Sequence, residues 1–372
     1  MHLLRHLLSR VAEDRLLVVL LVAAVPLLLA QPEAVHSLHH LVDWKTIGAL
    51  AGLLVLSRGL EDSGYLALAG RRLLTRVHGE RTLAVALVLF SAALAAVVTN
   101  DVALFIVVPL TISLRTVADL PLGRLVVFEA LAVNAGSTLS PVGNPQNLFI
   151  WQSTTLSFMD FVAMMLPLGL ALTVLVLAVI PLAFPSLRIE VRPGSAAPVL
   201  DRKLLHLSLA LYPAFLLLTD LGHAVATALA VIGVFALLRP RVLRGVDWLL
   251  LAVFVLMFVD LGLLAALPVM QSLATGIDAL PGGVFTAGVL LSQAISNVPA
   301  TIFLSGFTED MRALAWGVSV GGFGLAIGSL ANLIALRLSR QPGLWRDFHR
   351  WSVPLLLMAW GLALLLGRFG FG

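Results

Sequence analysis

The sequence predicts an all-α polytopic membrane protein made of two inverted repeats, each with a re-entrant helical hairpin and a broken transmembrane helix. The composition, the apolar runs along the whole chain and a repeated set of motifs lead to this prediction. Of the 372 residues, 60% are hydrophobic and 12% are charged, whereas a soluble domain carries about 25% charged residues. The mean hydropathy of +1.02 likewise excludes a globule surrounded by water.

Long apolar runs supply the transmembrane elements. A helix needs about 20 residues to cross roughly 30 Å of hydrocarbon, or somewhat fewer when its flanks reach the headgroups. Two segments, 82–115 and 283–308, are instead interrupted by polar tips. Exposed backbone at membrane depth survives only inside protein or beside a cavity, so these segments are expected to be re-entrant hairpins. Besides the two hairpins, about nine full spans are expected, at residues 15–30, 44–60, 124–151, 158–184, 204–219, 223–238, 248–267, 313–336 and 352–368.

The basic residues predict the orientation. With the N-terminus in the cytoplasm, all but three of the 24 Lys and Arg residues fall on the cytoplasmic side, as the positive-inside rule requires. The exceptions are Lys45, Arg312 and Arg368, and the C-terminus then lies in the periplasm. The pI near 10.3 therefore reflects topology signals, and no nucleic-acid partner is expected. The expected environment is the lipid bilayer of a bacterial inner membrane.

Motifs recur in the two halves of the chain, on opposite sides of the membrane. We place repeat one at 43–184, a cytoplasmic linker at 185–203 and repeat two at 204–368, within a single membrane transport domain, 1–372. Transporters with inverted repeats bind substrate and coupling ions near the midplane, where broken helices of the two halves meet. The recurring motifs are Asp43-Trp44 with Asp247-Trp248, Thr99-Asn100 with Ser296-Asn297, and Gly143-Asn144-Pro145-Gln146-Asn147-Leu148 with Gly328-Ser329-Leu330-Ala331-Asn332-Leu333.

Four interruptions of helices carry the polar groups expected to bind a ligand. Gly and Pro in the middle of a span stop a regular helix. The interruption frees carbonyls for a cation and exposes the amides and dipole of a half-helix to an anion. Structural kinks and hydrogen bonds between helices are the alternative interpretation, and the symmetric set of four favours a binding site. The candidate substrate- and ion-binding residues are Thr99, Asn100, Asp101, Asn134, Gly136, Ser137, Thr138, Gly143, Asn144, Pro145, Asn147, Ser296, Asn297, Pro299, Gly321, Gly328, Ser329 and Asn332.

Three carboxylates lie within apolar segments, where an ionised side chain that faces lipid costs at least about 2.5–3.5 kcal/mol. Asp101, at the first hairpin tip, is the leading candidate for a coupling group that ligates sodium or carries a proton. Its alternative role is to cap the half-helix that follows. Glu129 lies roughly one and a half turns before Asn134 and is either a proton relay or a packing hydrogen bond. Asp260 is the third coupling candidate, and Arg58, its rough counterpart in the other repeat, is its candidate partner.

Enzymatic chemistry is not expected. The chain has no cysteine, which excludes disulfides, thiolate metal sites and cysteine nucleophiles. Neither a Gly-x-Ser-x-Gly motif beside a membrane histidine nor a His-Glu-x-x-His motif occurs. His36, His39 and His40 cluster in the first external loop without a visible fourth ligand, so no metal site is expected. No cofactor is expected apart from sodium or a proton as the coupling ion.

The tips and breaks resemble motifs of the ion transporter superfamily. Thr99-Asn100-Asp101-Val102-Ala103-Leu104, followed by Pro109, resembles the Asn-Asp motif of arsenite permeases. Ser296-Asn297-Val298-Pro299-Ala300-Thr301 and Gly328-Ser329-Leu330-Ala331 resemble the matching second-repeat motifs. The stretch 134–147 is similar to the citrate–metal and sodium/proton antiporter branches. Over nearly its whole length the chain resembles uncharacterised bacterial inner-membrane transporters of the citrate transporter-like group.

The resemblance implies a scaffold domain and a mobile transport domain, an elevator-type movement and a homodimer. By position, one half of the ion site would consist of Thr99, Asn100, Asp101, Asn144 and Asn147. The other half would consist of Ser296, Asn297, Ser329 and Asn332. Neither tip carries the full Ser-Asn-Thr signature of the divalent-anion symporters, so the likeness to that branch does not extend to its dicarboxylate-binding threonines.

The expected function is secondary active transport of a small ion. An anion is favoured, either a citrate-like carboxylate or an inorganic oxyanion, because half-helix N-termini meet at the midplane beside few fixed carboxylates. Transport is expected to be coupled to sodium or protons. Arsenite or metalloid efflux and sodium/proton antiport are the alternatives within transport. A passive channel ranks below them, since inverted pairs of broken helices suit alternating access.

Overall fold

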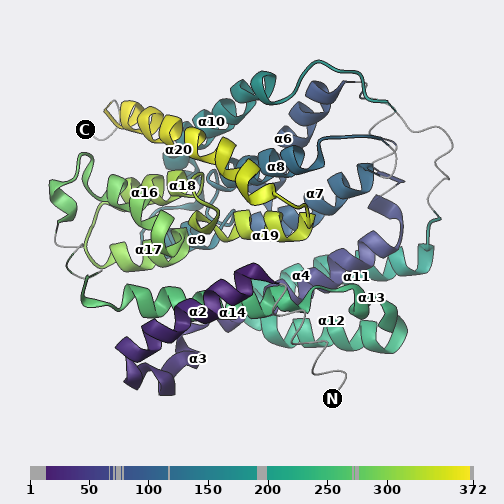
Figure 1. The fold of residues 1–372 in the computed structure, drawn as a ribbon, viewed down its shortest axis with the longest axis horizontal. Helices are drawn as coiled ribbons and strands as arrows, with labels where there is room; N and C mark the ends of the chain where they lie inside the picture. The colour runs from purple at the N-terminus through teal and green to yellow at the C-terminus, as the bar shows by residue number, and fades with distance from the viewer. Residues whose placement is uncertain are drawn as a thin grey trace. The chain divides into compact units, whose positions relative to one another are not determined.

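The protein is helical throughout the part of the chain that its computed structural model describes (Figure 1). That part comprises residues 14–66, 68, 69, 72, 77, 79–115, 118–190, 199–269, 272 and 276–368. These residues include no β-strand, and an isolated bridge joins Gly79 to Arg188. The all-α fold class is therefore confirmed. The chain separates into two compact units.

Unit 1 comprises Met1–Ser63 and Asp201–Ser272. Aspartates open three of its helices, because Asp14, Asp43 and Asp201 each accept a hydrogen bond from a backbone N–H of the first turn. In this unit α4 packs against α11, α12 and α14, and α14 packs against α2. The helices are α2 (Arg15–Ala30), the 3-10 helix η1 (Pro32–Ser37), α3 (Leu38–Leu41), α4 (Trp44–Asp62), α11 (Arg202–Leu218), the π-helical turn η2 (Thr219–His223), α12 (Ala224–Leu238), α13 (Pro240–Gly245) and α14 (Trp248–Ala265).

Unit 2 comprises Gly64–Leu200 and Leu273–Gly372. The same order of elements occurs twice in it: two helices joined by a short tip, two helices joined by a longer break, and one long helix. The helices are α6 (Glu80–Val97), α7 (Asn100–Leu114), α8 (Leu122–Ser137), α9 (Pro145–Gln152), α10 (Phe158–Ala183), η3 (Ile277–Ala279), α16 (Gly283–Ile295), α17 (Asn297–Ser305), α18 (Met311–Gly321), η4 (Ala326–Gly328), α19 (Leu330–Ser339) and α20 (Leu344–Arg368).

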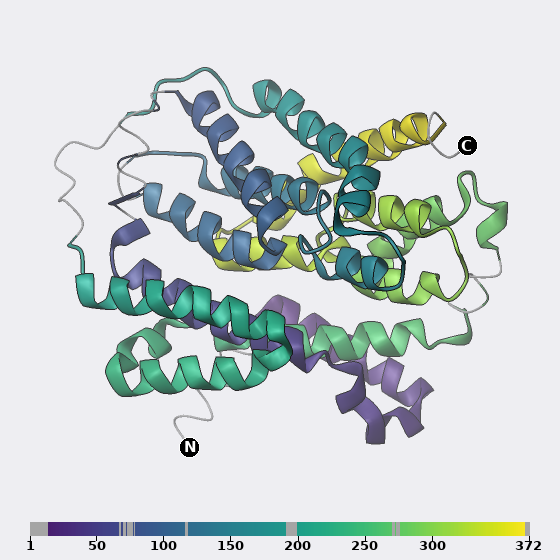
Figure 2. The same ribbon diagram turned by 180° about the vertical axis from the view of Figure 1, so that it is seen from behind.

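Helix α8 is the centre of unit 2. Every residue from 125 to 137 is buried, as expected of a helix that is enclosed on all sides. It packs against α6, α7, α10, α19 and α20, and both ribbon views show it among these neighbours (Figures 1 and 2). Gly136 permits the closest approach, because a Cβ there would lie 2.0 Å from the Ala92 carbonyl oxygen of α6.

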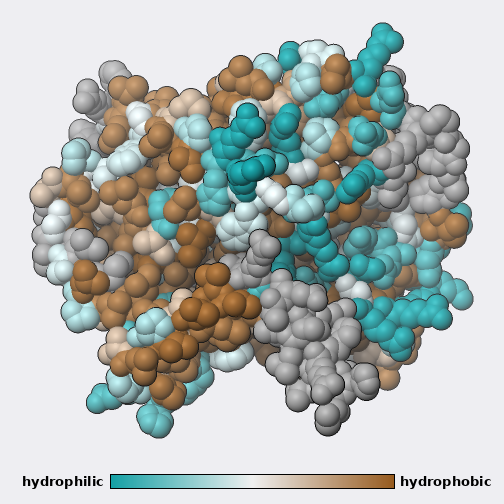
Figure 3. Space-filling model, in the orientation of Figure 1, coloured by the Kyte–Doolittle hydropathy of each residue, from teal (hydrophilic) through white to brown (hydrophobic). Residues whose placement is uncertain are grey.

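Apolar side chains cover much of the molecular surface, as lipid contact requires. Figure 3 shows apolar residues over a large part of one face. Leu182 on α10, Leu237 on α12 and Leu357 on α20 are each at least 60% exposed. Surfaces of this kind are rare on soluble monomers. The exposed residues therefore agree with a polytopic membrane protein.

The predicted spans correspond to helices, but not to nine uninterrupted ones. Among the described residues, four helical segments are long and apolar enough to cross a membrane: Glu80–Val97, Phe158–Ala183, Leu221–Leu238 and Leu344–Gly367. A fifth candidate is Leu17–Ala30 with Pro32–Leu41, a pair bent by 118°. Spans 124–151 and 313–336 each consist of two helices with a break between them, and α14 is a shorter apolar helix. The count of nine spans plus two hairpins stays a prediction.

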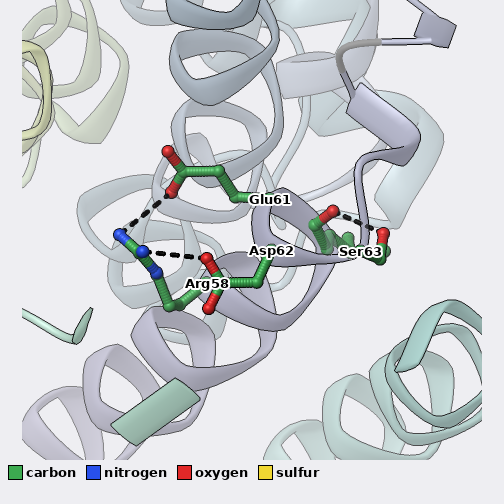
Figure 4. Close-up of polar contacts among 5 residues, drawn as sticks. Arg58, Glu61, Asp62 and Ser63 are labelled. Atoms are coloured by element: carbon green, nitrogen blue, oxygen red, sulfur yellow. Dashed lines mark hydrogen bonds and ion pairs between the residues drawn. The ribbon is translucent and has the colours of Figure 1, made fainter. Parts of the chain in front are cut away.

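Near the C-terminal end of α4, Arg58 forms ion pairs with carboxylates of the same helix (Figure 4). Arg58 Nη2 lies 2.8 Å from an Asp62 carboxylate oxygen, and Nη1 lies 3.7 Å from Glu61. In α14, both carboxylate oxygens of Asp260 are buried without a hydrogen-bond partner among the described residues. The predicted pairing of Asp260 with Arg58 is therefore wrong, because Arg58 finds its carboxylates one turn away on α4.

Candidate ion-binding site

The first tip consists of Val98 and Thr99, which join α6 to α7. Val98 is extended, with φ −114° and ψ 177°, so the helix ends there. Thr99 caps α7, because its side chain accepts a hydrogen bond from the backbone N–H of Val102 at 3.4 Å. Asn100 is buried, and its Oδ1 accepts a hydrogen bond from the Asp101 N–H at 2.8 Å. The predicted tip residues therefore begin a half-helix.

Asp101 is the second residue of α7, where the N–H groups of the first turn favour a negative charge. The cap of α7 is Thr99, so the alternative capping role of Asp101 is wrong. Within the described part of the chain, Asp101 Oδ1 is buried and has no hydrogen-bond partner. A buried carboxylate oxygen of this kind is costly unless a proton or a cation joins it.

The first break, residues 138–144, is held by its own asparagines. Asn144 caps α9, because its Oδ1 accepts a hydrogen bond from the Asn147 N–H at 2.8 Å, and Pro145 follows as the first helical residue. Asn144 Nδ2 donates to the Ser137 carbonyl at 3.1 Å. Asn147 Nδ2 lies 3.3, 3.2 and 3.1 Å from the carbonyls of Ser137, Thr138 and Ser140. These amides satisfy carbonyls that the end of α8 leaves free.

The first tip and the first break are joined directly. The backbone N–H of Asn100 donates a hydrogen bond to the Gly143 carbonyl at 2.7 Å. Asn147 Oδ1, which is fully buried, has no hydrogen-bond partner among the described residues. The predicted residues of repeat one therefore lie together, with unpartnered oxygen atoms on both α7 and α9.

The second tip is Ser296, between α16 and α17. Its backbone has φ 69° and ψ 157°, a conformation that residues other than glycine rarely adopt. The Ser296 hydroxyl does not cap α17, and it is buried without a hydrogen-bond partner in the described structure. Asn297 begins α17 and is buried, and Pro299 lies in the first turn, where a missing N–H costs nothing. Strain together with an unsatisfied hydroxyl is typical of functional positions.

The second break, residues 322–329, is held by a network that reaches across to α8. Asn134 Nδ2 donates to the Gly322 carbonyl at 3.1 Å and to Asn332 Oδ1 at 2.8 Å. Ser329 Oγ donates to Asn134 Oδ1 at 3.0 Å, and Asn332 Nδ2 donates to the Gly322 carbonyl at 2.9 Å. The structure thus brings the predicted residues Asn134, Ser329 and Asn332 together, while Gly321 and Gly328 end α18 and η4.

Two side chains that the sequence did not single out also hold the second break. Gln293 on α16 donates through Nε2 to the Gly321 carbonyl and accepts through Oε1 from the Leu325 N–H, both at 2.6 Å. His349 on α20 accepts a hydrogen bond from the Ala326 N–H through Nε2 at 3.1 Å. The signal for Gln293 was its polar amide in a helix that is otherwise apolar or small. Nothing in the sequence linked His349 to Ala326, which lies 23 residues earlier in the chain.

The other two coupling candidates are not residues of the tips or breaks. Glu129 is fully buried in α8, where its Oε1 accepts a hydrogen bond from the Thr111 hydroxyl, while Oε2 has no partner among the described residues. The packing role predicted for Glu129 is therefore present, and a relay role stays a prediction. Asp260 belongs to unit 1 and is not part of this cluster.

A Gly-x-Ser-x-Gly pattern occurs at Gly317-Val318-Ser319-Val320-Gly321. A hydrolase nucleophile of this pattern requires a sharp turn between a strand and a helix. All five residues instead lie within α18. The pattern therefore carries no nucleophile here.

Four half-helices converge in unit 2. Helix α7 packs against α19, and α17 packs against α9, so each tip half-helix meets the break half-helix of the other set. Asp101, Asn147 and Ser296 place unpartnered oxygens at the starts of α7, α9 and α17. Helix starts bind anions, and oxygen atoms are the ligands that hard cations prefer. The starts of these half-helices therefore offer oxygen ligands for a cation and N–H groups for an anion.

Comparison with known proteins identifies a family and several relatives of this chain. A family model described as "Citrate transporter", CitMHS, matches residues 11–321. The chain is 43% identical over 347 residues to "Inner membrane protein YbiR" of Escherichia coli (strain K12), covering 93% of both chains.

Two further relatives extend the range of similarity. "Uncharacterized transporter MJ0456" of Methanocaldococcus jannaschii is 31% identical over 305 residues, covering 81% of this chain and 82% of that protein. "Silicon efflux transporter LSI3" of Oryza sativa subsp. japonica is 31% identical over 130 residues, covering 35% of this chain and 27% of that protein. The match over most of its length shows that this chain belongs to the CitMHS citrate transporter family, a family of membrane transporters and not of enzymes.

Proposed function

We propose that the protein is a secondary active transporter of a small ion, with an anion favoured, either a citrate-like carboxylate or an inorganic oxyanion. The observation that carries this proposal is the convergence of α7, α9, α17 and α19 in one unit. Three of these half-helices begin with a buried oxygen that lacks a partner in the described structure, on Asp101, Asn147 and Ser296. Midplane sites of transporters are built from such half-helix ends.

The charges around the half-helices favour coupling to sodium or protons. The tips and breaks contain no Lys or Arg, and Asp101 is their single ionisable residue. A carboxylate repels an anion that binds beside it. A proton or a sodium ion on Asp101 removes that repulsion, so cation and anion binding strengthen one another reciprocally. Symport of an anion with the coupling ion is the simplest consequence.

The repeated order of elements supports two inverted repeats. We assign α6–α7 and α16–α17 as the re-entrant hairpins, and α8–α9 and α18–α19 as the broken transmembrane helices. The boundaries 43–184 and 204–368 accommodate these assignments. Part of the proposed cytoplasmic linker 185–203, residues 191–198, lies outside the described residues. The basic residues, of which all but Lys45, Arg312 and Arg368 would then lie in the cytoplasm, support a cytoplasmic N-terminus and a periplasmic C-terminus.

An elevator-type movement fits the division of the chain. Every candidate binding residue belongs to unit 2, with Asp260 alone among the coupling candidates in unit 1. We propose unit 2 as the mobile transport domain and unit 1 as the scaffold of a homodimer. A bacterial inner membrane is the proposed location, in keeping with the relative named an inner membrane protein.

Metalloid efflux is the second candidate, favoured by the similarity to the silicon efflux transporter. An uncharged metalloid hydroxide needs hydrogen-bonding amides and hydroxyls and no basic side chain. The asparagine- and serine-rich breaks offer these groups. In this case Asp101 would carry a proton in exchange for the substrate.

Transport measurements in liposomes separate these functions. Solid-supported-membrane currents would be recorded for citrate, succinate, phosphate and sulfate, with and without sodium or pH gradients. Accumulation of arsenite and silicic acid would be measured by elemental analysis, because neutral substrates give no current of their own. Asp101→Asn removes the charge at nearly constant volume, and Asp260→Asn makes the same change at the coupling candidate of unit 1.

A gradient-driven signal for one substrate, lost in Asp101→Asn and kept in Asp260→Asn, is the expected result. A signal that survives Asp101→Asn would remove this carboxylate from the coupling mechanism. Accumulation of metalloids without anion currents would favour the second candidate. Flux of any substrate that never exceeds equilibrium under either gradient would contradict secondary active transport.

A further inference from the structure

Three side chains from other helices, Asn134, Gln293 and His349, hold the second break, and of these only His349 can change its charge. Gln293 joins the end of α18 to the middle of the break, since it bonds both the Gly321 carbonyl and the Leu325 N–H. His349 bonds the next N–H, that of Ala326. Together they hold consecutive backbone groups of a segment that lies in the candidate ion site.

The hydrogen bonds fix the protonation state of His349. A backbone N–H can only donate, so His349 Nε2 must be an unprotonated acceptor for Ala326. The other nitrogen, Nδ1, lies 2.6 Å from the Trp345 carbonyl, which can only accept, so Nδ1 carries the proton. The imidazole is therefore neutral while it holds the break. A second proton on Nε2 would face the Ala326 N–H donor to donor, and the bond would be lost.

We propose that Gln293 and His349 are positioning residues for the second break, and that protonation of His349 releases its hold on the segment 325–326. Histidine is the side chain whose charge changes between about pH 5 and 8. Protonation and the bond to Ala326 exclude one another. The fraction of molecules in which His349 accepts the Ala326 N–H therefore falls as the pH falls. The hydrogen bonds of the Gln293 amide stay, because an amide does not change its charge.

The charged groups on the elements packed against α20 have contacts of their own. Helix α20 packs against α8, α10, α18 and η4. Of these elements, η4 has no charged residue. Each charged group on those helices has another contact: Arg124 with the Ala183 carbonyl, Glu129 with Thr111, Asp160 with Ser157 and Arg312 with the Trp316 ring. On α20 itself, Trp345 stacks on His349, and Arg346, Asp347 and Arg350 are exposed neighbours in sequence.

This inference deepens the proposed function, but its test does not depend on transport. The chain has no cysteine, so Leu325→Cys introduces a single thiol at a side chain that is 40% exposed. A nitroxide is attached at one fixed pH, and its mobility is then followed by electron paramagnetic resonance from pH 8 to pH 5. The matched control carries the nitroxide at Val142, in the first break, which asparagines hold.

The expected result is a mobile component at residue 325 that grows as the pH falls, with the ratio of mobile to held label rising by up to about tenfold per pH unit. The label at 142 should not respond. His349→Gln keeps an acceptor and cannot titrate, so it should keep the label held at every pH. Gln293→Ala should raise mobility at high pH and keep the pH dependence.

Two results would overturn the inference: a label at 325 that does not respond to pH, or a response that persists in His349→Gln. Either can occur whether or not the protein transports an anion. A failed transport assay with an intact pH response would reject the proposed function alone.

Discussion

The two breaks of unit 2 look alike in sequence but are held in different ways. The first break is tied to the end of its own helix by Asn144 and Asn147, within ten residues of chain. The second break has one such local amide, that of Asn332, and it is held in addition from three other helices, through Asn134, Gln293 and His349. A locally closed segment keeps its shape when its neighbours move, whereas a segment held from outside can shift with them.

The two tips differ as the two breaks do: the first is closed by its own residues, and the second is not. Thr99 has ordinary backbone angles and caps α7 with its side chain. Ser296 has a positive φ and leaves its hydroxyl unused. In the proposed site, the first tip and break would form a preformed half, and the second tip and break would form a strained half with bonds available for exchange. This difference is what a site needs if one half stays constant while the other responds to a ligand.

The largest effect should follow from a methyl group in each break. In Gly143→Ala the new Cβ would lie 2.2 Å from the Ser137 carbonyl oxygen, which is backbone and cannot move away. We expect a loss of at least about 3 kcal/mol in stability, or failure to fold, seen as loss of the monodisperse peak in detergent chromatography.

In Gly324→Ala the Cβ would lie 2.0 Å from Gln293 Oε1, the end of a flexible side chain. A folded protein with a melting temperature lowered by a few degrees is expected there. Equal damage at both positions would contradict the contrast between a closed and an externally held break.

An intermediate effect should follow from removal of the amide of Asn147. Asn147→Ala takes the side-chain donor away from the Thr138 carbonyl, whereas the Ser137 carbonyl keeps Asn144. The expected loss is about 2 kcal/mol, because a buried acceptor is left unsatisfied. Thermal unfolding in detergent measures it.

The matched control is Ser140→Ala, in the same break. The Ser140 hydroxyl is buried without a partner among the described residues, so its removal should change stability by less than about 0.5 kcal/mol. If Ser140→Ala were as damaging as Asn147→Ala, the asparagine amides would not be what closes the first break.

The smallest effect, and the one of opposite sign, is expected at the second tip. Ser296→Gly removes the cost of a positive φ and should stabilise the protein by about 1 kcal/mol. Thr99→Gly, the matched change in the first tip, should destabilise it by a few tenths of a kcal/mol through loss of the cap. Melting temperatures that fall in both variants would show that the Ser296 backbone is not strained.

The sequence located the tips and breaks well, because they are local events. Polar residues, Gly and Pro within apolar runs predicted tips at Thr99-Asn100-Asp101 and Ser296-Asn297 and interruptions within 134–147 and 321–329, and helices do end and begin within these stretches. The support of the second break could not be predicted. Gln293 and His349 reach it through tertiary packing, which no spacing in the sequence encodes.

The sequence also could not decide how many of the spans are uninterrupted. Apolar composition marks a segment as compatible with lipid, but it does not say whether backbone hydrogen bonds continue through a Gly- or Pro-containing stretch. The predicted pairing of Asp260 with Arg58 was wrong for a related reason. Arg58 had two carboxylates within one turn of its own helix, and local pairs form before distant ones are needed.

The most direct test of the central claim, that a coupling cation or proton binds at Asp101, needs no substrate. The melting temperature of the purified protein would be measured in sodium and in choline, at pH 6 and pH 8, for the wild type, Asp101→Asn and Asp260→Asn. A ligand that binds only the folded protein raises the melting temperature. We predict that sodium or low pH stabilises the wild type and Asp260→Asn but not Asp101→Asn. A response in Asp101→Asn equal to that of the wild type would contradict the claim.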